Sequence, residues 1–188
     1  PTCRSAWEKR LGAPLPWREV GALFQGGLLT PKDYSSYYKN ILHRAMLVRS
    51  RMPAPDGSKC CRCCHGPEEH FVHLADCAVL RTECWDRVAS LAGLPFSRKL
   101  ALLGATSQSG VLPRGLASLW ILAWKFVIIE MTQVGLHGGE VDARAAWRQA
   151  VRRLVVRVHA KVHCFRVSLI SAEGKGGKLP APSALNAL

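Results

Sequence analysis

Cysteine and histidine residues crowd one short segment of the chain, residues 59–77. This segment holds five of the eight cysteines and three of the seven histidines. A Cys-x-x-Cys pair is followed, nine or ten residues later, by His73 and then by Cys77. Thiolates and imidazoles at such spacing are typical of a tetrahedral Cys3His site for zinc. The alternative, a group of buried or disulfide-bonded cysteines, makes the spacing of His73 and Cys77 a coincidence. The sequence therefore predicts one structural Zn2+ ion.

The first half of this predicted site can be aligned in two ways, because the cysteines are doubled. Only one of the two overlapping pairs can bind at a time without straining the turn. We prefer the ligand set Cys60, Cys63, His73 and Cys77, with Cys61 and Cys64 as the alternate first pair. The two remaining thiols then lie beside the metal. His65 and His70 are reserve donors or, in the simpler interpretation, solvated loop residues.

Helices are expected on both sides of this loop. Thr30-Pro31-Lys32-Asp33 offers an N-cap, a proline at the first helical position and an acid in the first turn, so it predicts a helix running to about Arg51. A second helix is expected from about Asp76 to Ala92. His73 and Cys77 are four residues apart, which places them on one face of a first helical turn. Shorter helices are expected in residues 1–28.

The segment from Leu116 to Val134 predicts a strongly apolar helix at the centre of the fold, with Trp120 and Trp124 on one stripe. Lys125 and Glu130 interrupt its longest apolar run, which favours a buried helix over a membrane span. The predicted fold class is therefore mainly α: a small helical domain with one zinc-binding loop between helices and a disordered C-terminal tail. We divide it into residues 1–28, 29–92 (the zinc-binding module), 93–170 (a helical bundle) and 171–188 (the tail).

The last predicted helix, residues 140–169, is basic. Its inward face is expected to contain Val151, Leu154, Val155, Val158 and Val162, although these β-branched residues also allow a strand within 162–170. The formal net charge of the chain is +13, and the basic excess lies at its two ends. Basic stripes on a helix suit a phosphate backbone. The predicted nucleic-acid-binding residues are Arg144, Arg148, Arg152, Arg153, Arg157 and Lys161.

Several motifs follow one another in a fixed order along the chain. They are Leu29-Thr30, Cys60/Cys63 or Cys61/Cys64, Glu69, His73-Leu74, Cys77 and Trp85. This order resembles the reverse-transcriptase zinc-binding domain, a module that follows the polymerase in many non-LTR retrotransposon proteins. The resemblance covers roughly residues 20–90, and the doubled cysteines depart from the family pattern. It implies a role in target-primed reverse transcription, in which the module helps to hold RNA or the target site beside an upstream reverse-transcriptase domain.

Catalysis is not expected of this chain. No Asp-Asp pair occurs, so the paired carboxylates that hold polymerase Mg2+ are missing. A zinc deaminase needs His-x-Glu before its Cys-x-x-Cys, whereas here the cysteine pair comes first. Cys164 follows His163 directly, and adjacent side chains on a helix point apart. The predicted function is a non-catalytic zinc-binding and nucleic-acid-binding module. The alternative is a zinc-stabilised protein-interaction domain with an acidic partner.

Two further expectations concern the origin of the chain and its location in the cell. It begins at Pro1 with polar and charged residues, which suggests a fragment of a longer protein without a secretory signal. A cysteine pattern typical of a metal site fits a reducing compartment. We therefore expect an intracellular protein, with the nucleus as one location, that is not secreted and has no membrane partner.

Overall fold

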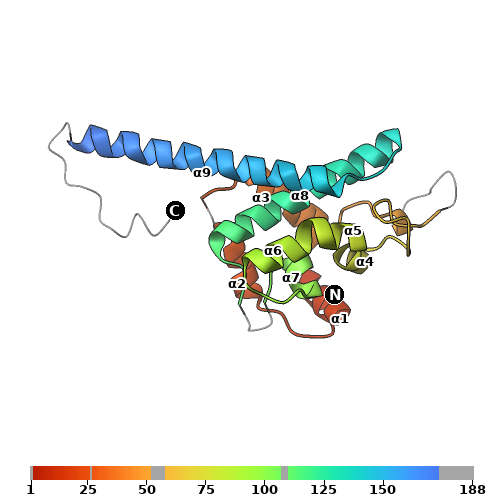
Figure 1. Cartoon of the computed structure of the whole chain (residues 1–188). Coiled ribbons are helices and arrows are strands. Elements are labelled where there is room, and N and C mark those ends of the chain that lie inside the picture. Colours follow the sequence, from red (N-terminus) through yellow and green to blue (C-terminus); the bar gives the residue numbers. More distant parts are fainter. Residues whose placement is uncertain (1, 26, 52–57, 107–109, 174–188) are drawn as a thin grey trace.

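The computed structural model describes residues 2–25, 27–51, 58–106 and 110–173. Within these ranges the chain is mainly helical and forms no strand, only isolated β-bridges that join Cys60 to Glu68 and Ala105 to Val111. A Cys/His cluster lies between helices, so the predicted fold class is confirmed (Figure 1). The predicted disorder of the tail concerns residues outside the described ranges from 174 onward. Residues 171–173 are still part of the last helix.

The N-terminal helices are α1 (Cys3–Leu11), α2 (Trp17–Ala22) and α3 (Pro31–Tyr37), with the short turns η1 (Leu23–Gln25) and η2 (Tyr38–Leu42). Thr30 caps α3 as predicted: its side chain accepts from the Asp33 N–H, and the Asp33 carboxylate accepts from the Thr30 N–H. The prediction that this helix runs to Arg51 is wrong, because it ends at Leu42. Arg44 then takes a left-handed φ of 53°, and the chain turns toward Glu69 through η3 (Arg49–Arg51).

The middle of the chain contains α4 (Phe71–Asp76), α5 (Ala78–Leu80), the π-helical turn η4 (Arg81–Trp85), α6 (Asp86–Leu91) and α7 (Arg98–Leu103). The helix predicted for residues 76–92 is therefore present from Ala78 to Leu91. Cys77 has an extended ψ of 118°, and this separates α4 from α5. The break lets Cys77 end one helix and precede the next.

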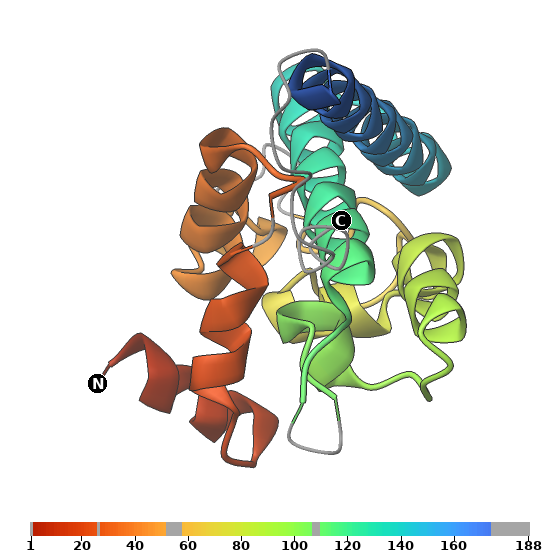
Figure 2. The ribbon, with the colours of Figure 1, turned by 90° about the vertical axis from the view of Figure 1, so that its left-hand side faces the viewer.

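Two long helices complete the fold, α8 (Arg114–His137) and α9 (Ala143–Glu173). Figure 1 shows α8 running through the body and α9 lying across it. In Figure 2 the blue, C-terminal end of α9 points toward the viewer, and Figure 1 shows this end extending beyond the other helices. The strand considered for residues 162–170 does not form, since this segment belongs to α9.

Four fully buried tryptophans organise the core, and each indole N–H finds a backbone carbonyl. Trp120 and Trp124 of α8 both donate to the Ala101 carbonyl, at 3.0 and 2.8 Å. Trp7 donates to Leu42 at 3.0 Å. Trp85 packs on Trp124 with ring centroids 4.6 Å apart, which brings residues of 29–92 and 93–170 into one core. The division of the chain at these boundaries stays a prediction.

Among the described helices, α8 alone is long and apolar enough to cross a membrane by length and composition. Its most apolar 18-residue window is 61 % buried within the protein. This burial agrees with the helix predicted at the centre of the core.

Candidate metal centre

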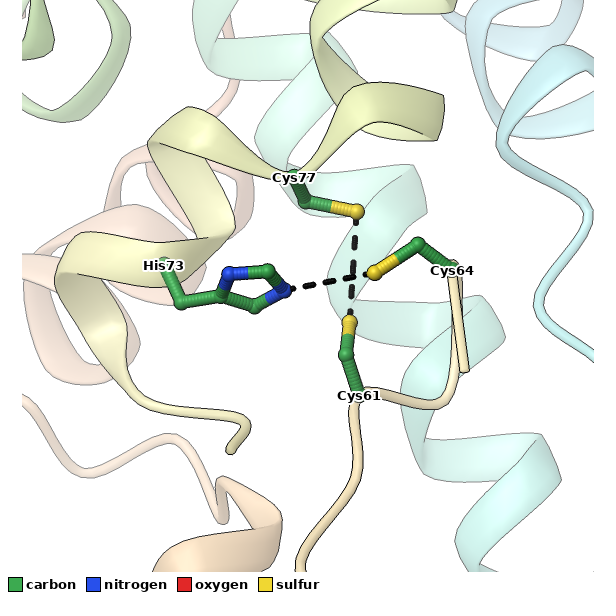
Figure 3. A group of neighbouring side chains, drawn as sticks. All are labelled: Cys61, Cys64, His73 and Cys77. Atoms are coloured by element: carbon green, nitrogen blue, oxygen red, sulfur yellow. Dashed lines mark hydrogen bonds between the residues drawn. The ribbon is translucent and has the colours of Figure 1, made fainter. Parts of the chain in front are cut away.

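Four side chains converge at the loop that precedes α4 (Figure 3). The ligand atoms of Cys61, Cys64, His73 and Cys77 all lie within 4.8 Å of one another. The sulfurs of Cys61 and Cys77 are 3.9 Å apart, and the Cys64 sulfur is 3.4 Å from His73 Nε2. Three of these residues are buried and Cys64 is half-buried. The arrangement is a Cys3His site that can hold one metal ion.

The first two donors are placed by a tight turn. The Cys61 N–H donates to the Pro67 carbonyl at 3.0 Å, and the Glu69 N–H donates to the Lys59 carbonyl at 2.9 Å. Between these bonds the chain reverses: the His65 N–H bonds to the Cys61 carbonyl at 2.9 Å, and His65 has a left-handed φ of 55°. This reversal brings the Cys61 and Cys64 side chains to the same side of the loop (Figure 3).

The other two donors come from α4 and its end. The Cys77 N–H donates to the His73 carbonyl at 2.6 Å, so one helical turn sets the distance between the two side chains. His70 caps this helix, since its Nδ1 accepts from the His73 N–H at 3.0 Å. His65 is 59 % exposed and lies 3.4 Å from the Glu140 carboxylate. Neither reserve histidine belongs to the cluster, and His70 has a structural role that the sequence did not reveal.

The cluster contains the alternate first pair, Cys61 and Cys64, and not the preferred pair, Cys60 and Cys63. The physical reason is the antiparallel bridge between Cys60 and Glu68. Side chains alternate in extended backbone, so when Cys61 points toward His73, Cys60 points away. Cys60 is accordingly exposed.

Cys63 is a fourth cysteine, beside the three of the cluster. It is 8 % exposed, and its N–H donates to the Cys61 sulfur at 3.4 Å. Hydrogen bonding to the thiols of Cys61 and Cys77, together with burial, raises the pKa of Cys63. Hydrogen bonds with the thiols of Cys61 and Cys63 lower the pKa of Cys77. Cys77 is therefore the favoured thiolate of this group, and Cys63 is the favoured neutral thiol.

A buried ion pair between Arg62 and Glu69 supports the turn. No sequence pattern identifies Arg62 as part of the site. Arg62 is 7 % exposed and Glu69 is fully buried, with Arg62 Nη2 and Glu69 Oε1 2.6 Å apart. The Glu69 carboxylate also accepts the N–H groups of Arg62 and Arg49, at 2.9 and 2.8 Å. Arg62 in turn donates to the carbonyls of Leu47 and Met131, each at 2.8 Å. The Cys-x-x-Cys turn is thereby fastened to α8.

Trp85 fastens α4 to α8 in a similar way. Its indole N–H donates to the Leu74 carbonyl at 3.1 Å, directly after His73 in the chain. Its ring packs against Trp124 of α8. Both halves of the donor set are thus held against the same central helix.

The predicted basic surface is only partly solvent-facing. Arg144, Arg148, Arg152 and Arg153 are exposed. Arg157 instead forms an ion pair with Asp33, with Nη1 2.6 Å from Oδ2. Lys161 is half-buried, and its ammonium group lies against Gly27. The last two predicted nucleic-acid-binding residues therefore lie against the body of the protein.

The predicted inward face of this helix is also only partly right. Val151 and Leu154 pack against the core. Val155 and Val158 are 48 and 42 % exposed, so their predicted inward orientation is wrong. Lys161, further along α9, still lies against the body, so the two valines are exposed because they lie on another side of the helix.

Comparison of the chain with protein-family models, with curated proteins and with solved structures gave no match. The resemblance to the reverse-transcriptase zinc-binding domain rests on the motif residues of this chain alone. The function is accordingly inferred from the geometry of the site.

Proposed function

We propose that this chain is a non-catalytic, zinc-stabilised module that binds nucleic acid through its phosphates. The single observation that carries the metal part is the grouping of Cys61, Cys64, His73 and Cys77. Three sulfurs and one imidazole nitrogen form a donor set that favours Zn2+ over Mg2+ or Ca2+, which prefer oxygen. A tetrahedron with Zn–S bonds of about 2.3 Å separates two sulfurs by about 3.8 Å. The Cys61–Cys77 distance of 3.9 Å fits this geometry.

A structural role suits this zinc site better than a catalytic one. Catalytic zinc sites keep one position for water or substrate, whereas structural sites have four protein ligands. Here the protein supplies four donors, and Cys61, His73 and Cys77 are buried. The ion would join the turn at residues 61–64 to α4, two pieces too short to be stable alone.

The nucleic-acid part of the proposal rests on charge and exposure. Arg144, Arg148 and Arg152 are all exposed and follow one another at four-residue spacing along α9. Such a stripe can follow a phosphate backbone. The net charge of +13 supports association with a polyanion. We leave Arg157 out of this surface because it is already ion-paired with Asp33.

A relation to the reverse-transcriptase zinc-binding domain is the family-level form of the same proposal. It is supported by where the residues of the resemblance lie. Thr30 caps α3, Glu69 holds the Cys-x-x-Cys turn, and Trp85 holds the helix that bears His73. Each of them positions an element of the candidate metal centre or of the core around it.

Fluorescence anisotropy with labelled single-stranded RNA and duplex DNA, over a series of salt concentrations, tests the nucleic-acid part. The variant Arg144→Gln/Arg148→Gln/Arg152→Gln should weaken binding and flatten the slope of log K against log salt by about two to three units. The matched control removes three arginines that are ion-paired with acids at the surface: Arg81→Gln, Arg87→Gln and Arg98→Gln.

Both triple variants lower the net charge equally, so a general charge effect would weaken them alike. We expect the control to keep the wild-type slope. Equal slopes for all three proteins would reject α9 as the binding surface. The absence of binding by the wild type at low salt would reject nucleic acid as the partner.

A further inference from the structure

The middle of α9 carries an apolar strip that the described part of the protein covers only in part. Val155 and Val158 are 48 and 42 % exposed. Val151 and Val162, on either side of them in the chain, are half-buried. A contiguous patch of apolar side chains on a protein surface often marks an interaction site. We call Val151, Val155, Val158 and Val162 the valine seam.

The spacing within the valine seam is that of a coiled coil. Its members follow one another at intervals of four, three and four residues, which matches alternating a and d positions of a heptad. In the sequence, Phe165 and Leu169 continue the same intervals. Nothing in the described part of the fold requires a heptad spacing on this side of α9, since Arg157 and Lys161 contact the body from another side of the helix. A second helix lying along the seam would use it.

The charges beside the seam are all of one sign. From residue 143 to residue 172 the sequence contains no aspartate or glutamate. With Val155 and Val162 at a positions, Arg152 takes an e position, which faces a partner helix across the seam, and it is exposed. Lys161 takes a g position, but its ammonium group lies against Gly27, so the body of the protein borders the seam on that side. A partner with acidic residues at its own e and g positions would complement them.

We propose that the valine seam is a docking site for an acidic amphipathic helix of another protein. A second copy of this chain fits the seam less well, because it would set basic flanks against basic flanks. Nucleic acid also fits it less well, since valines offer neither a charge for phosphate nor an aromatic face for a base. Arg152 borders both surfaces, but the seam is defined by its valines, so this proposal does not depend on nucleic-acid binding.

The test uses a synthetic peptide of about four heptads, with leucine at a and d and glutamate at e and g. Its binding to the full chain is measured by fluorescence anisotropy. Val155→Ser/Val158→Ser should weaken binding by about tenfold or more, because two apolar contacts are lost. Serine and valine have similar helix propensities, so α9 itself should persist, as circular dichroism can verify.

Val156→Ser supplies the matched control. Val156 is 61 % exposed, more than Val155 or Val158, but it occupies neither an a nor a d position. Its replacement should change the affinity by less than about twofold. A second peptide with lysine at e and g should not bind, because its charges oppose those of α9.

Three results would overturn the proposal. The first is an equal effect of Val156→Ser and of the seam variant on peptide binding, or no effect of either. The second is a wild-type dimer in sedimentation velocity that the seam variant abolishes, which would assign the seam to a second copy. The third is an equal loss of RNA affinity in the seam variant, which would make the seam part of the nucleic-acid surface. This last readout is separate from the arginine variants, so the two proposals can fail independently.

Discussion

Arg157, in the middle of α9, is ion-paired with Asp33 of α3, with Nη1 2.6 Å from Oδ2. Asp33 is fully buried, and its other carboxylate oxygen lies 2.6 Å from the Lys125 ammonium of α8. Thr30 donates to the same carboxylate through its N–H and its hydroxyl group. One buried carboxylate thus joins three helices that are distant in the sequence.

Asp33→Asn should lower the free energy of unfolding by about 2–3 kcal/mol. The amide keeps the size of the side chain but leaves Lys125 and Arg157 without their counter-charge. We choose the lower end of the usual range because these two side chains are 19 and 22 % exposed and regain some hydration. Urea unfolding at neutral pH measures the difference. A loss below about 0.5 kcal/mol would show that the pairs contribute little.

The contribution of Asp33 should also depend on pH. Burial by itself raises the pKa of Asp33, but hydrogen bonds from Lys125, Thr30 and Arg157 outweigh it and hold this pKa well below its usual range. A carboxyl whose folded-state pKa is lowered stabilises the fold fully above its unfolded-state pKa of about 3.9. The contribution is lost as the pH falls through the folded-state pKa.

The stability difference between wild type and Asp33→Asn should therefore stay constant above about pH 5 and shrink below about pH 4. Both proteins have the same zinc ligands, so acid release of the metal affects them alike and cancels in the difference. A difference that grows on acidification would contradict the assigned direction of the pKa shift.

Arg157 and Arg152 should behave differently although both are arginines of α9. Arg157→Gln should cost about 1–2 kcal/mol of stability and increase amide exchange in α9, because Asp33 then keeps only Lys125. Arg152 is exposed, and Arg152→Gln should change stability by less than about 0.5 kcal/mol while weakening RNA binding. Urea unfolding and anisotropy on both variants check this. The opposite pattern would return Arg157 to the nucleic-acid surface.

Glu69→Gln should weaken zinc binding by roughly tenfold or more, because the buried Arg62 loses its partner and the Cys-x-x-Cys turn loosens. Glu68 is the matched control, since it precedes Glu69 directly but is exposed. Competition with a chromophoric chelator gives both affinities. Equal affinities of Glu68→Gln and Glu69→Gln would show that the buried pair does not position the ligands.

Much of this fold could be predicted because its signals are local. The cap at Thr30, the apolar helix around Trp120 and the step from His73 to Cys77 are each contained in a few consecutive residues. The spacing of apolar residues predicts which residues are buried better than it predicts where a helix ends. Val48 lies within the range of the helix predicted to run to Arg51 and is buried, but the helix has already ended at Leu42.

The remaining features depend on contacts between distant residues. The two overlapping cysteine pairs have the same internal spacing, and the choice between them follows from the pairing of Cys60 with Glu68. Arg157 looks like its exposed neighbours until α3 brings Asp33 to it. Val155 and Val158 continue an apolar period that begins on the core, yet they lie on a side of α9 that the described part of the protein does not cover.

The metal content of the purified protein tests the central claim most directly. The wild type should contain about one zinc per chain. Cys60→Ser and Cys63→Ser should keep it, because neither thiol belongs to the cluster of four donors. Cys61→Ser should lose the zinc and loosen the segment from Lys59 to Cys77 in amide exchange. A folded wild type that takes up no zinc, or a Cys61→Ser protein that keeps its zinc while Cys60→Ser loses it, would contradict the assignment.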